Sequence, residues 1–188
     1  MEKRTLWFVD TETGGLDCGI YSILSVGLVK WVDGFFETFG EWYVKESPMI
    51  VSPEALAVNQ IDLRKPGDFW PVKAVVAEIM RVVPQVESKE FQPILGGHNT
   101  PFDVGFLKRL FRLANVPYPF SYRYVDTCAI GRFLLDAGLI EAENAGLEAL
   151  CARFGVNQPK HTALGDAVAS AELYTAMLNF VKYGGDSE

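Results

Sequence analysis

The stretch that decides the fold lies near the start of the chain and reads TLWFVDTETGG at residues 5–15. Residues 5–9 are apolar and rich in strand-forming types, which predicts a buried β-strand. Asp10 and Glu12 follow, two positions apart. Because side chains alternate along a strand, both carboxylates are expected on one side of the sheet. Such a pair repels itself unless a cation lies between, although the motif alone also fits a polar strand exit that leads into a turn at Thr13–Gly15.

Strand-like and helix-like segments alternate along the rest of the chain. Apolar runs rich in β-branched and aromatic residues predict further strands, at 22–31, 35–44, 93–97 and 122–125. Asp33-Gly34 predicts a tight hairpin turn between the first two of these. Helical periodicity, cap residues and early prolines predict helices, at 53–59, 69–83, 100–114, 127–137, 145–154 and 163–183. This order predicts one α/β domain over residues 1–188, with a mixed sheet covered by helices.

The composition describes a globular chain with an acidic charge balance. It has 188 residues, 49% of them apolar, a net charge of −7 and an isoelectric point near 4.9. This balance argues against a protein that coats long nucleic acid by neutralising phosphates, but not against one that engages a chain end at a metal site. Three dispersed cysteines form no metal or disulfide pattern, and neither a signal peptide nor a membrane span is recognisable. We therefore expect a reduced, cytoplasmic protein that does not enter membranes.

Basic residues gather in one place, the run FLKRLFR at 106–112. Two interpretations stay open for this run. It is either the solvated face of an amphipathic helix or a patch that contacts phosphates.

Both histidines of the chain stand in short acidic motifs. His98 begins HNTPFD, and its Asp103 falls in the first turn of a helix that follows a strand, where open α/β sheets gather ligands. His161 begins HTALGD, and its Asp166 flanks the apolar face of the last helix. Taken singly, Asp103 also fits an ordinary first-turn acid favoured by the helix dipole, and His161 a plain loop residue.

The three acidic motifs are more informative together than one at a time. They supply four carboxylates, from Asp10, Glu12, Asp103 and Asp166, which suit two hard divalent cations such as Mg²⁺ or Mn²⁺. A histidine, with an ordinary pKa of about 6.5, takes up a proton from water near neutral pH. The joint pattern therefore predicts hydrolysis by phosphoryl transfer to water, with a histidine as the general base.

These motifs resemble those of the DEDDh-type 3′–5′ exonucleases, the DnaQ-like family that includes proofreading subunits of replicative polymerases and RNase T. The matching segments are DTETG at 10–14, HNTPFDVGFL at 98–107 and HTALGD at 161–166. The resemblance covers about residues 4–182. It implies a ribonuclease-H-like mixed sheet of about five strands flanked by helices. It also implies two metal ions, Mg²⁺ or Mn²⁺, and release of nucleoside 5′-monophosphates from single-stranded DNA or RNA 3′ ends.

The resemblance implies a role for each motif residue. The metal ligands would be Asp10, Glu12, Asp103 and Asp166, with His161 as the catalytic base. Contacts to the terminal nucleotide would come from the backbone of Thr13 and Gly14 and from Leu16 against the base. The remaining three residues would shape the pocket floor or orient Asp103, and they are His98, Asn99 and Phe102. One departure is visible, because many relatives carry a His-Gly-Ile-like segment where this chain reads AVNQI at 57–61. Base contacts and the choice between DNA and RNA therefore stay open.

Two function hypotheses of different classes follow. The leading one is a metal-dependent 3′–5′ exonuclease that favours DNA slightly over RNA. The other is an exonuclease-like module that acts mainly by binding a polymerase or repair complex, with Phe35, Phe36 or Phe39 as exposed apolar contacts for that partner or for a homodimer. An inert scaffold is disfavoured because the set of acids and the histidine are intact.

Overall fold

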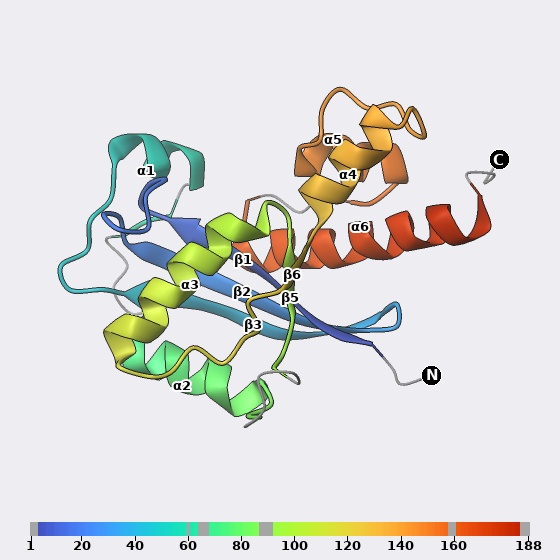
Figure 1. The fold of residues 1–188 in the computed structure, drawn as a ribbon. Coiled ribbons are helices and arrows are strands. Elements are labelled where there is room, and N and C mark those ends of the chain that lie inside the picture. Colours follow the sequence, from blue (N-terminus) through green and yellow to red (C-terminus); the bar gives the residue numbers. More distant parts are fainter. Residues whose placement is uncertain (1–3, 60, 64–67, 87–91, 158–160, 185–188) are drawn as a thin grey trace.

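The computed structural model describes residues 4–59, 61–63, 68–86, 92–157 and 161–184. Within them a six-stranded mixed sheet has the order β4-β3-β2-β1-β5-β6. Its strands are β1 (Thr5–Thr13), β2 (Ile23–Val32), β3 (Phe35–Lys45), β4 (Phe69–Pro71), β5 (Leu95–Gly97) and β6 (Tyr124–Asp126). The helices are α1 (Pro53–Asn59), α2 (Val72–Val82), α3 (Thr100–Ala114), α4 (Thr127–Asp136), α5 (Leu147–Phe154) and α6 (Ala163–Tyr183). The predicted α/β sheet flanked by helices is confirmed (Figure 1).

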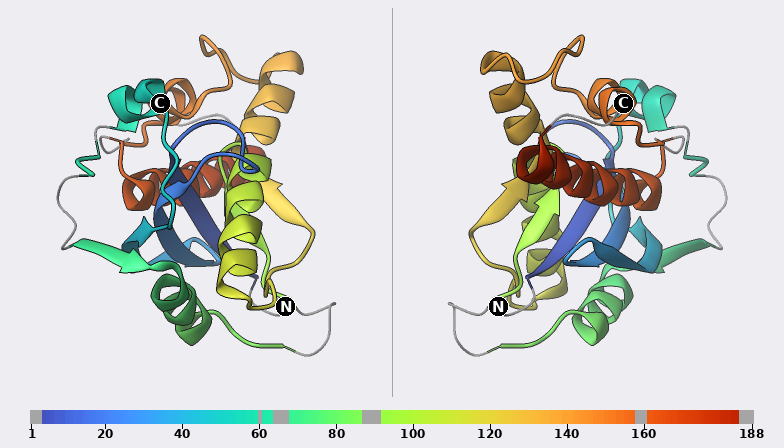
Figure 2. Two further views of the ribbon diagram at one scale, coloured as in Figure 1. Left: turned by 90° about the vertical axis from the view of Figure 1, so that its left-hand side faces the viewer. Right: turned by 90° about the vertical axis from the view of Figure 1, so that its right-hand side faces the viewer.

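The central strand β1 buries both of its faces. It pairs antiparallel with β2 and parallel with β5. Trp7 and Val9 pack in the core that α2 and α3 cover, whereas Leu6 and Phe8 pack against the alanine-rich face of α6. Figure 2 shows α6 on one side of the sheet and α2 and α3 on the other. Burial on both sides explains why β1 begins as an unbroken apolar run instead of an alternating one.

The local start and turn signals are confirmed. Ser52 caps α1, because its Oγ accepts a hydrogen bond from the Ala55 amide at 3.1 Å. The β2–β3 hairpin turns at Asp33 and Gly34, whose φ angles of 49° and 94° are both positive. Two left-handed residues are what a tight type I′ turn requires, and glycine adopts that conformation without steric cost.

The sequence expectation was wrong for residues 69–71, which form strand β4 instead of the first turn of a helix. β4 pairs parallel with the edge of β3, with Phe69 opposite Tyr43. Pro71 has ψ 144° and ends the strand as the residue before α2. An edge strand tolerates proline because the missing N–H needs no ladder partner there. The sheet therefore has six described strands instead of about five, and β1 also continues to Thr13, past the predicted end at Val9.

A third core lies between α4, α5 and α6. It contains Leu134, Leu150 and Leu173, and it is separate from the two cores that flank the sheet. α6 contacts α4 and α5 in this core and also lies along the sheet, with its N-terminus near the end of β1 (Figure 1). In the described part of the chain, no helix combines the length and apolar character needed to cross a membrane.

Candidate active site

Asp10 and Glu12 lie on the face of the sheet that α6 covers. Their partners on β2 are Gly27 and Ser25, and the register is continuous through Glu12. Phe8, which has the same parity in β1, packs against α6. Because side chains alternate along a strand, both carboxylates point to the α6 side. The prediction that they share one side of the sheet is confirmed.

Asp103 approaches the same place from the opposite face. It lies in the first turn of α3 and is 2% exposed. Thr11, which points away from the α6 face, donates its hydroxyl to Oδ1 of Asp103 at 2.8 Å. Burial raises the pKa of Asp103 to about 7, although the bond from Thr11 favours the ionised form. A carboxyl with a pKa of about 7 is close to half protonated at neutral pH. Strongly shifted pKa values of this kind are frequent at functional sites.

The third motif is positioned by the start of α6. Thr162 is its N-cap, with its hydroxyl accepting from the Gly165 amide at 3.1 Å and its carbonyl accepting from the Asp166 amide at 2.9 Å. Asp166 therefore lies in the first turn of α6. His161 precedes the cap, is exposed, and has a φ of 33°. This left-handed residue turns the chain into the helix just before the acid.

The carboxylates of the three motifs are close enough to repel each other. The pKa of Asp10 is raised well above its ordinary value. Burial is the largest cause, followed by repulsion from four carboxylates, those of Asp103, Asp166, Glu12 and Glu41. The structure thus brings together the four predicted ligands, which are separated by up to 156 residues in sequence (from Asp10 to Asp166). Glu41 on β3 joins them, and no sequence motif pointed to it.

Glu12 lies between the acid cluster and His161. Burial raises its pKa to about 7, repulsion from Asp166 and Glu41 adds to the rise, and His161 lowers it. A polar pocket of about 340 Å³ has Glu12, Glu41 and His161 among its lining residues. The predicted base is therefore next to the predicted metal ligands.

The chemistry of these residues fits a hard divalent cation. As they stand, no three His, Cys, Asp or Glu side chains in the described residues are arranged to hold a metal ion. The donors are nevertheless all carboxylate oxygens, which hard divalent cations prefer. Repulsion between these carboxylates contributes to the raised pKa values of Asp10 and Glu12, and a bound cation would offset that repulsion. The individual metal-ligand assignments stay predictions.

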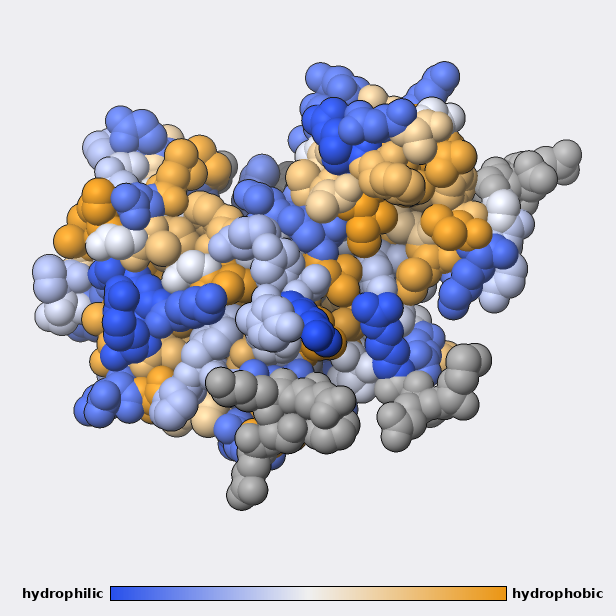
Figure 3. Space-filling view, viewed as in Figure 1, coloured by the Kyte–Doolittle hydropathy of each residue, from blue (hydrophilic) through white to orange (hydrophobic). Residues whose placement is uncertain are grey.

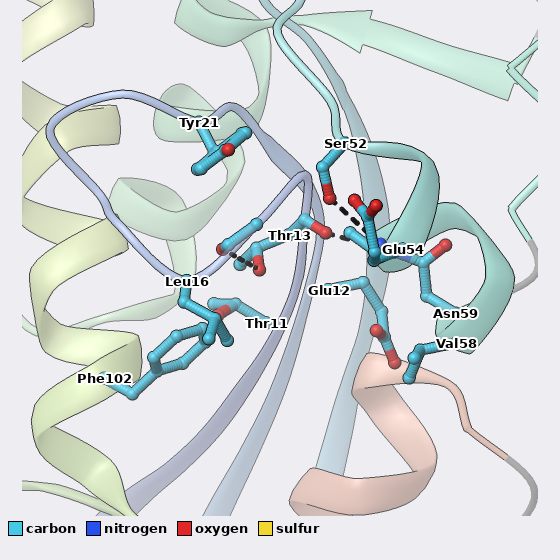
Figure 4. A pocket seen from close by; sticks show the side chains of 12 residues that line it. Thr11, Glu12, Thr13, Leu16, Tyr21, Ser52, Glu54, Val58, Asn59 and Phe102 are labelled. Atoms are coloured by element: carbon cyan, nitrogen blue, oxygen red, sulfur yellow. Dashed lines mark hydrogen bonds between the residues drawn. The ribbon is translucent and has the colours of Figure 1, made fainter.

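Glu12 also lines a larger pocket, of about 570 Å³ (Figure 4). Leu16, which is 87% exposed, and Phe102 present apolar surfaces in it. The remaining lining residues come from β1, the following loop and α1, and they are Thr11, Glu12, Thr13, Gly15, Tyr21, Ser52, Glu54, Ala55, Val58 and Asn59. Three of the predicted substrate residues, Thr13, Leu16 and Phe102, therefore meet in one cavity beside the acid cluster.

Asn59 stands where the family motif departs, and the sequence did not reveal its partner. Its Nδ2 donates to the carbonyl of Thr13 at 3.1 Å, and its Oδ1 accepts from the Ile61 amide at 3.2 Å. It also lines both pockets. Glu54 lines the larger pocket and was visible in the sequence only as part of a helix start. The departure from the family motif at AVNQI (57–61) was the one signal in the sequence that pointed to this part of the larger pocket.

The other predicted substrate residues have different surroundings. The Gly14 amide and carbonyl are both engaged, with Ser22 and Ser52 respectively, at 2.7 Å each. His98 pairs through Nδ1 with the Thr127 hydroxyl at 2.9 Å, and burial lowers its pKa. The Asn99 amide donates to Asp126 at 2.9 Å. His98 and Asn99 therefore connect α3 to α4 and line neither pocket, and their roles toward substrate stay predictions.

The basic run on α3 contains a structural arginine. Arg109 pairs with the buried carboxylate of Glu46 at 2.8 Å and also donates to the carbonyl of Cys18 at 3.3 Å. Lys108 lies over the ring of Tyr118, 5.7 Å from its centre. Arg109 thus anchors the loop that carries Leu16, and the phosphate-patch interpretation does not apply to it.

The mixed sheet gathers carboxylates from three separate motifs at one strand end, an arrangement that is typical of one class of proteins, the nucleases. Within that class the chain belongs to the RNase T exonuclease family, whose model matches residues 7–174. The predicted membership of the DnaQ-like exonuclease group is confirmed.

Two curated relatives support this family membership. The chain is 30% identical to the DNA polymerase III subunit epsilon of Escherichia coli, with 90% of this chain and 69% of the relative aligned. It is also 30% identical to a DNA polymerase III subunit epsilon-like protein of Rhodobacter capsulatus, with 98% of this chain and 25% of that one aligned.

Solved structures of E. coli exonuclease I share the fold. The complex with a dT13 oligonucleotide gives a TM-score of 0.76 at 20% identity, covering 95% of this chain and 41% of that one. A zinc-bound complex with single-stranded DNA gives 0.77 at 19% identity, covering 97% and 41%. At this identity the likeness concerns the fold alone. The chain thus spans a quarter of the Rhodobacter relative and about two fifths of exonuclease I.

Proposed function

We propose that this chain is a divalent-metal-dependent 3′–5′ exonuclease that releases nucleoside 5′-monophosphates from single-stranded 3′ ends. The observation that carries the proposal is the meeting of carboxylates from three distant segments around Asp10, next to His161. Repelling, buried carboxylates destabilise a fold, so their presence together favours a function that needs them. The family membership supplies the reaction class.

In the proposed mechanism, Asp10, Glu12, Asp103 and Asp166 would hold two divalent ions, Mg²⁺ or Mn²⁺. When bound, such ions activate the attacking water and stabilise the leaving oxygen. His161 lies in the polar pocket beside Glu12, where it accepts the proton that the water loses. Thr11 keeps one oxygen of Asp103 hydrogen-bonded, which orients that carboxylate toward the site.

The larger pocket is the proposed site of the terminal nucleotide. Leu16 and Phe102 offer apolar surfaces on which a base can stack, and Glu12 lies at the edge next to the acid cluster. A cavity of about 570 Å³ is in the usual range for a small ligand. We propose that the base enters this pocket, which leaves the scissile phosphate at the carboxylates. A slight preference for DNA over RNA is part of the proposal, and the similarity to the DNA polymerase III subunit epsilon of E. coli favours it.

A second candidate is an exonuclease-like module that docks on a polymerase or repair complex. Phe35 is 82% exposed and Phe36 42% exposed at the β2–β3 hairpin, and Phe39 has a side chain outside the described residues. Figure 3 shows further apolar side chains gathered over α4 and α5, where Phe133 is exposed. The E. coli relative is named as a polymerase subunit. These surfaces suit a protein partner or a homodimer. We also propose that the protein acts in the reducing cytoplasm, in agreement with its free cysteines.

The decisive experiment is a time course on 5′-labelled single-stranded DNA and RNA of matched sequence. Reactions contain Mg²⁺, Mn²⁺ or excess chelator, with Asp10→Ala as the control enzyme. Stepwise shortening that needs both metal and Asp10 is expected, faster on DNA. Wild-type activity in Asp10→Ala would falsify the metal assignment, and no shortening of either strand would favour the docking module.

A further inference from the structure

Glu41 lies in a row with the central carboxylate of the site. On the sheet, Asp10 of β1 is opposite Gly27 of β2, and Gly27 is opposite Glu41 of β3. Residues paired in this way point to the same face, so Asp10 and Glu41 both project toward α6. Between them Gly27 leaves a gap with no side chain.

The N-terminus of α6 occupies that gap. A Cβ on Gly27 would lie 2.3 Å from backbone atoms of Ala163 and Leu164, which no side chain can accept without displacing the helix. The start of α6 therefore rests directly on β2. His161 and Asp166 lie on either side of this contact, two residues before Ala163 and three after it.

Glu41 binds the helix at that contact. Its Oε1 accepts hydrogen bonds from the Ala163 amide at 3.2 Å and from the Ser25 hydroxyl at 3.0 Å. Ser25 is the strand partner of Glu12. One carboxylate oxygen thus joins the strand beside the first motif to the first residue of α6. The Ala163 amide is one of the donors that a helix cannot satisfy internally, and the N-cap hydroxyl of Thr162 is used on Gly165 instead.

The charge of Glu41 has a cost at this place. It adds to the repulsion that raises the pKa values of Asp10 and Glu12. A role confined to packing would be served without a negative charge so close to the acid cluster. The compensating gain is a charge-assisted hydrogen bond to a helix N-terminus, where the helix dipole favours an anion.

We propose that Glu41 is a positioning residue, which holds the N-terminus of α6 so that His161 and Asp166 face Asp10 and Glu12. The proposal rests on the proposed exonuclease function for its kinetic consequence, but not for its structural one. Displacements of about 1 Å in a catalytic group reduce rates by about 100-fold. Loss of the Glu41 bond is expected to act on the rate of the chemical step, because the nucleotide pocket does not contain Glu41.

Two variants separate the hydrogen bond from the charge. Glu41→Gln retains an oxygen that accepts from Ala163, whereas Glu41→Ala retains none. Glu37→Ala is the matched control, since Glu37 is an exposed glutamate on the same strand. We expect kcat to fall about 100-fold in Glu41→Ala with KM changed less than about threefold, and most of kcat to return in Glu41→Gln. Glu37→Ala should equal the wild type.

A second readout is independent of activity. The chain has two histidines, so their ring signals in an NMR spectrum are readily assigned. Glu41→Ala should shift or broaden the His161 signal and leave His98 unchanged, and Glu41→Gln should resemble the wild type. Wild-type kcat and an unchanged His161 signal in Glu41→Ala overturn the proposal, as does an equal loss in both variants. An inactive wild type with the expected NMR changes overturns the exonuclease function alone.

Discussion

Glu46 and Asp103 are both buried carboxylates, yet their surroundings are opposite. Glu46, 5% exposed, receives the Arg109 guanidinium at 2.8 Å and the Ile23 amide at 3.0 Å. Asp103, 2% exposed, receives the Thr11 hydroxyl. Burying a charge is costly unless a partner of opposite charge accompanies it. The fold itself supplies that partner for Glu46, whereas the site around Asp103 is suited to a cation from solution.

The difference separates two parts of one site. The Glu46–Arg109 pair holds the loop that carries Leu16, so this ion pair ties the proposed nucleotide pocket to the fold. The acid cluster around Asp10 is held in place against its own repulsion. Substitutions should therefore lower stability in the first part and activity in the second.

The largest effect is expected from Asp10→Asn. Removing this central carboxylate should reduce kcat by about 10³-fold or more, because metal ions supply several kcal/mol of transition-state stabilisation. The same change removes repulsion from its acidic neighbours, so metal-free stability should stay equal or rise. Single-turnover kinetics and urea unfolding measure the two quantities. A clear loss of stability would mean that Asp10 is structural, like Glu46.

His161→Ala tests the neighbour of the cluster. Loss of a general base should lower kcat by about 10²- to 10⁴-fold, with little change in stability because the side chain is exposed. Single-turnover kinetics measures the rate of the chemical step. Retention of the wild-type rate would assign proton transfer to another group.

In contrast to the two preceding substitutions, Glu46→Ala should lower stability more than it lowers kcat. It removes the carboxylate partner of the partly buried Arg109 guanidinium, so the free energy of unfolding should fall by about 3 kcal/mol in urea titrations. At low temperature, where the variant is folded, kcat should stay near the wild-type value while KM rises as the Leu16 loop loosens. A primary loss of kcat would contradict the division between the two parts.

The smallest effect is a dependence of metal-free stability on pH. The pKa values of Glu12 and Asp103 are raised to about 7 in the fold, so the folded state keeps protons that the unfolded state releases near pH 4. This stabilisation is present below about pH 4 and is lost as the pH rises through about 7. In chelator, the melting temperature should therefore fall between about pH 5 and 7.5, by about 3 °C or more. Mg²⁺ should raise it at pH 7.5 and much less at pH 5, and Asp10→Asn should weaken both trends.

Several features of this molecule could be predicted because they depend on neighbouring residues. The Ser52 cap, the Asp33-Gly34 turn and the alternation of Asp10 and Glu12 are local, and the structure confirms each. The motif around Asp103 was recognised by its position after a strand. β4 was missed, because a three-residue strand containing Pro71 exists only through its pairing with β3.

By itself the sequence determined the family, the acidic motifs and the order of most elements, since each is written in short patterns of polarity and spacing. Only the tertiary structure decided that Arg109 pairs with Glu46 and that Glu41 binds the start of α6. These partners are 63 and 122 residues apart in the chain. The physical reason is that a charge or a hydrogen-bond acceptor acts on what lies within a few ångströms, and the fold alone determines which distant residues come that close.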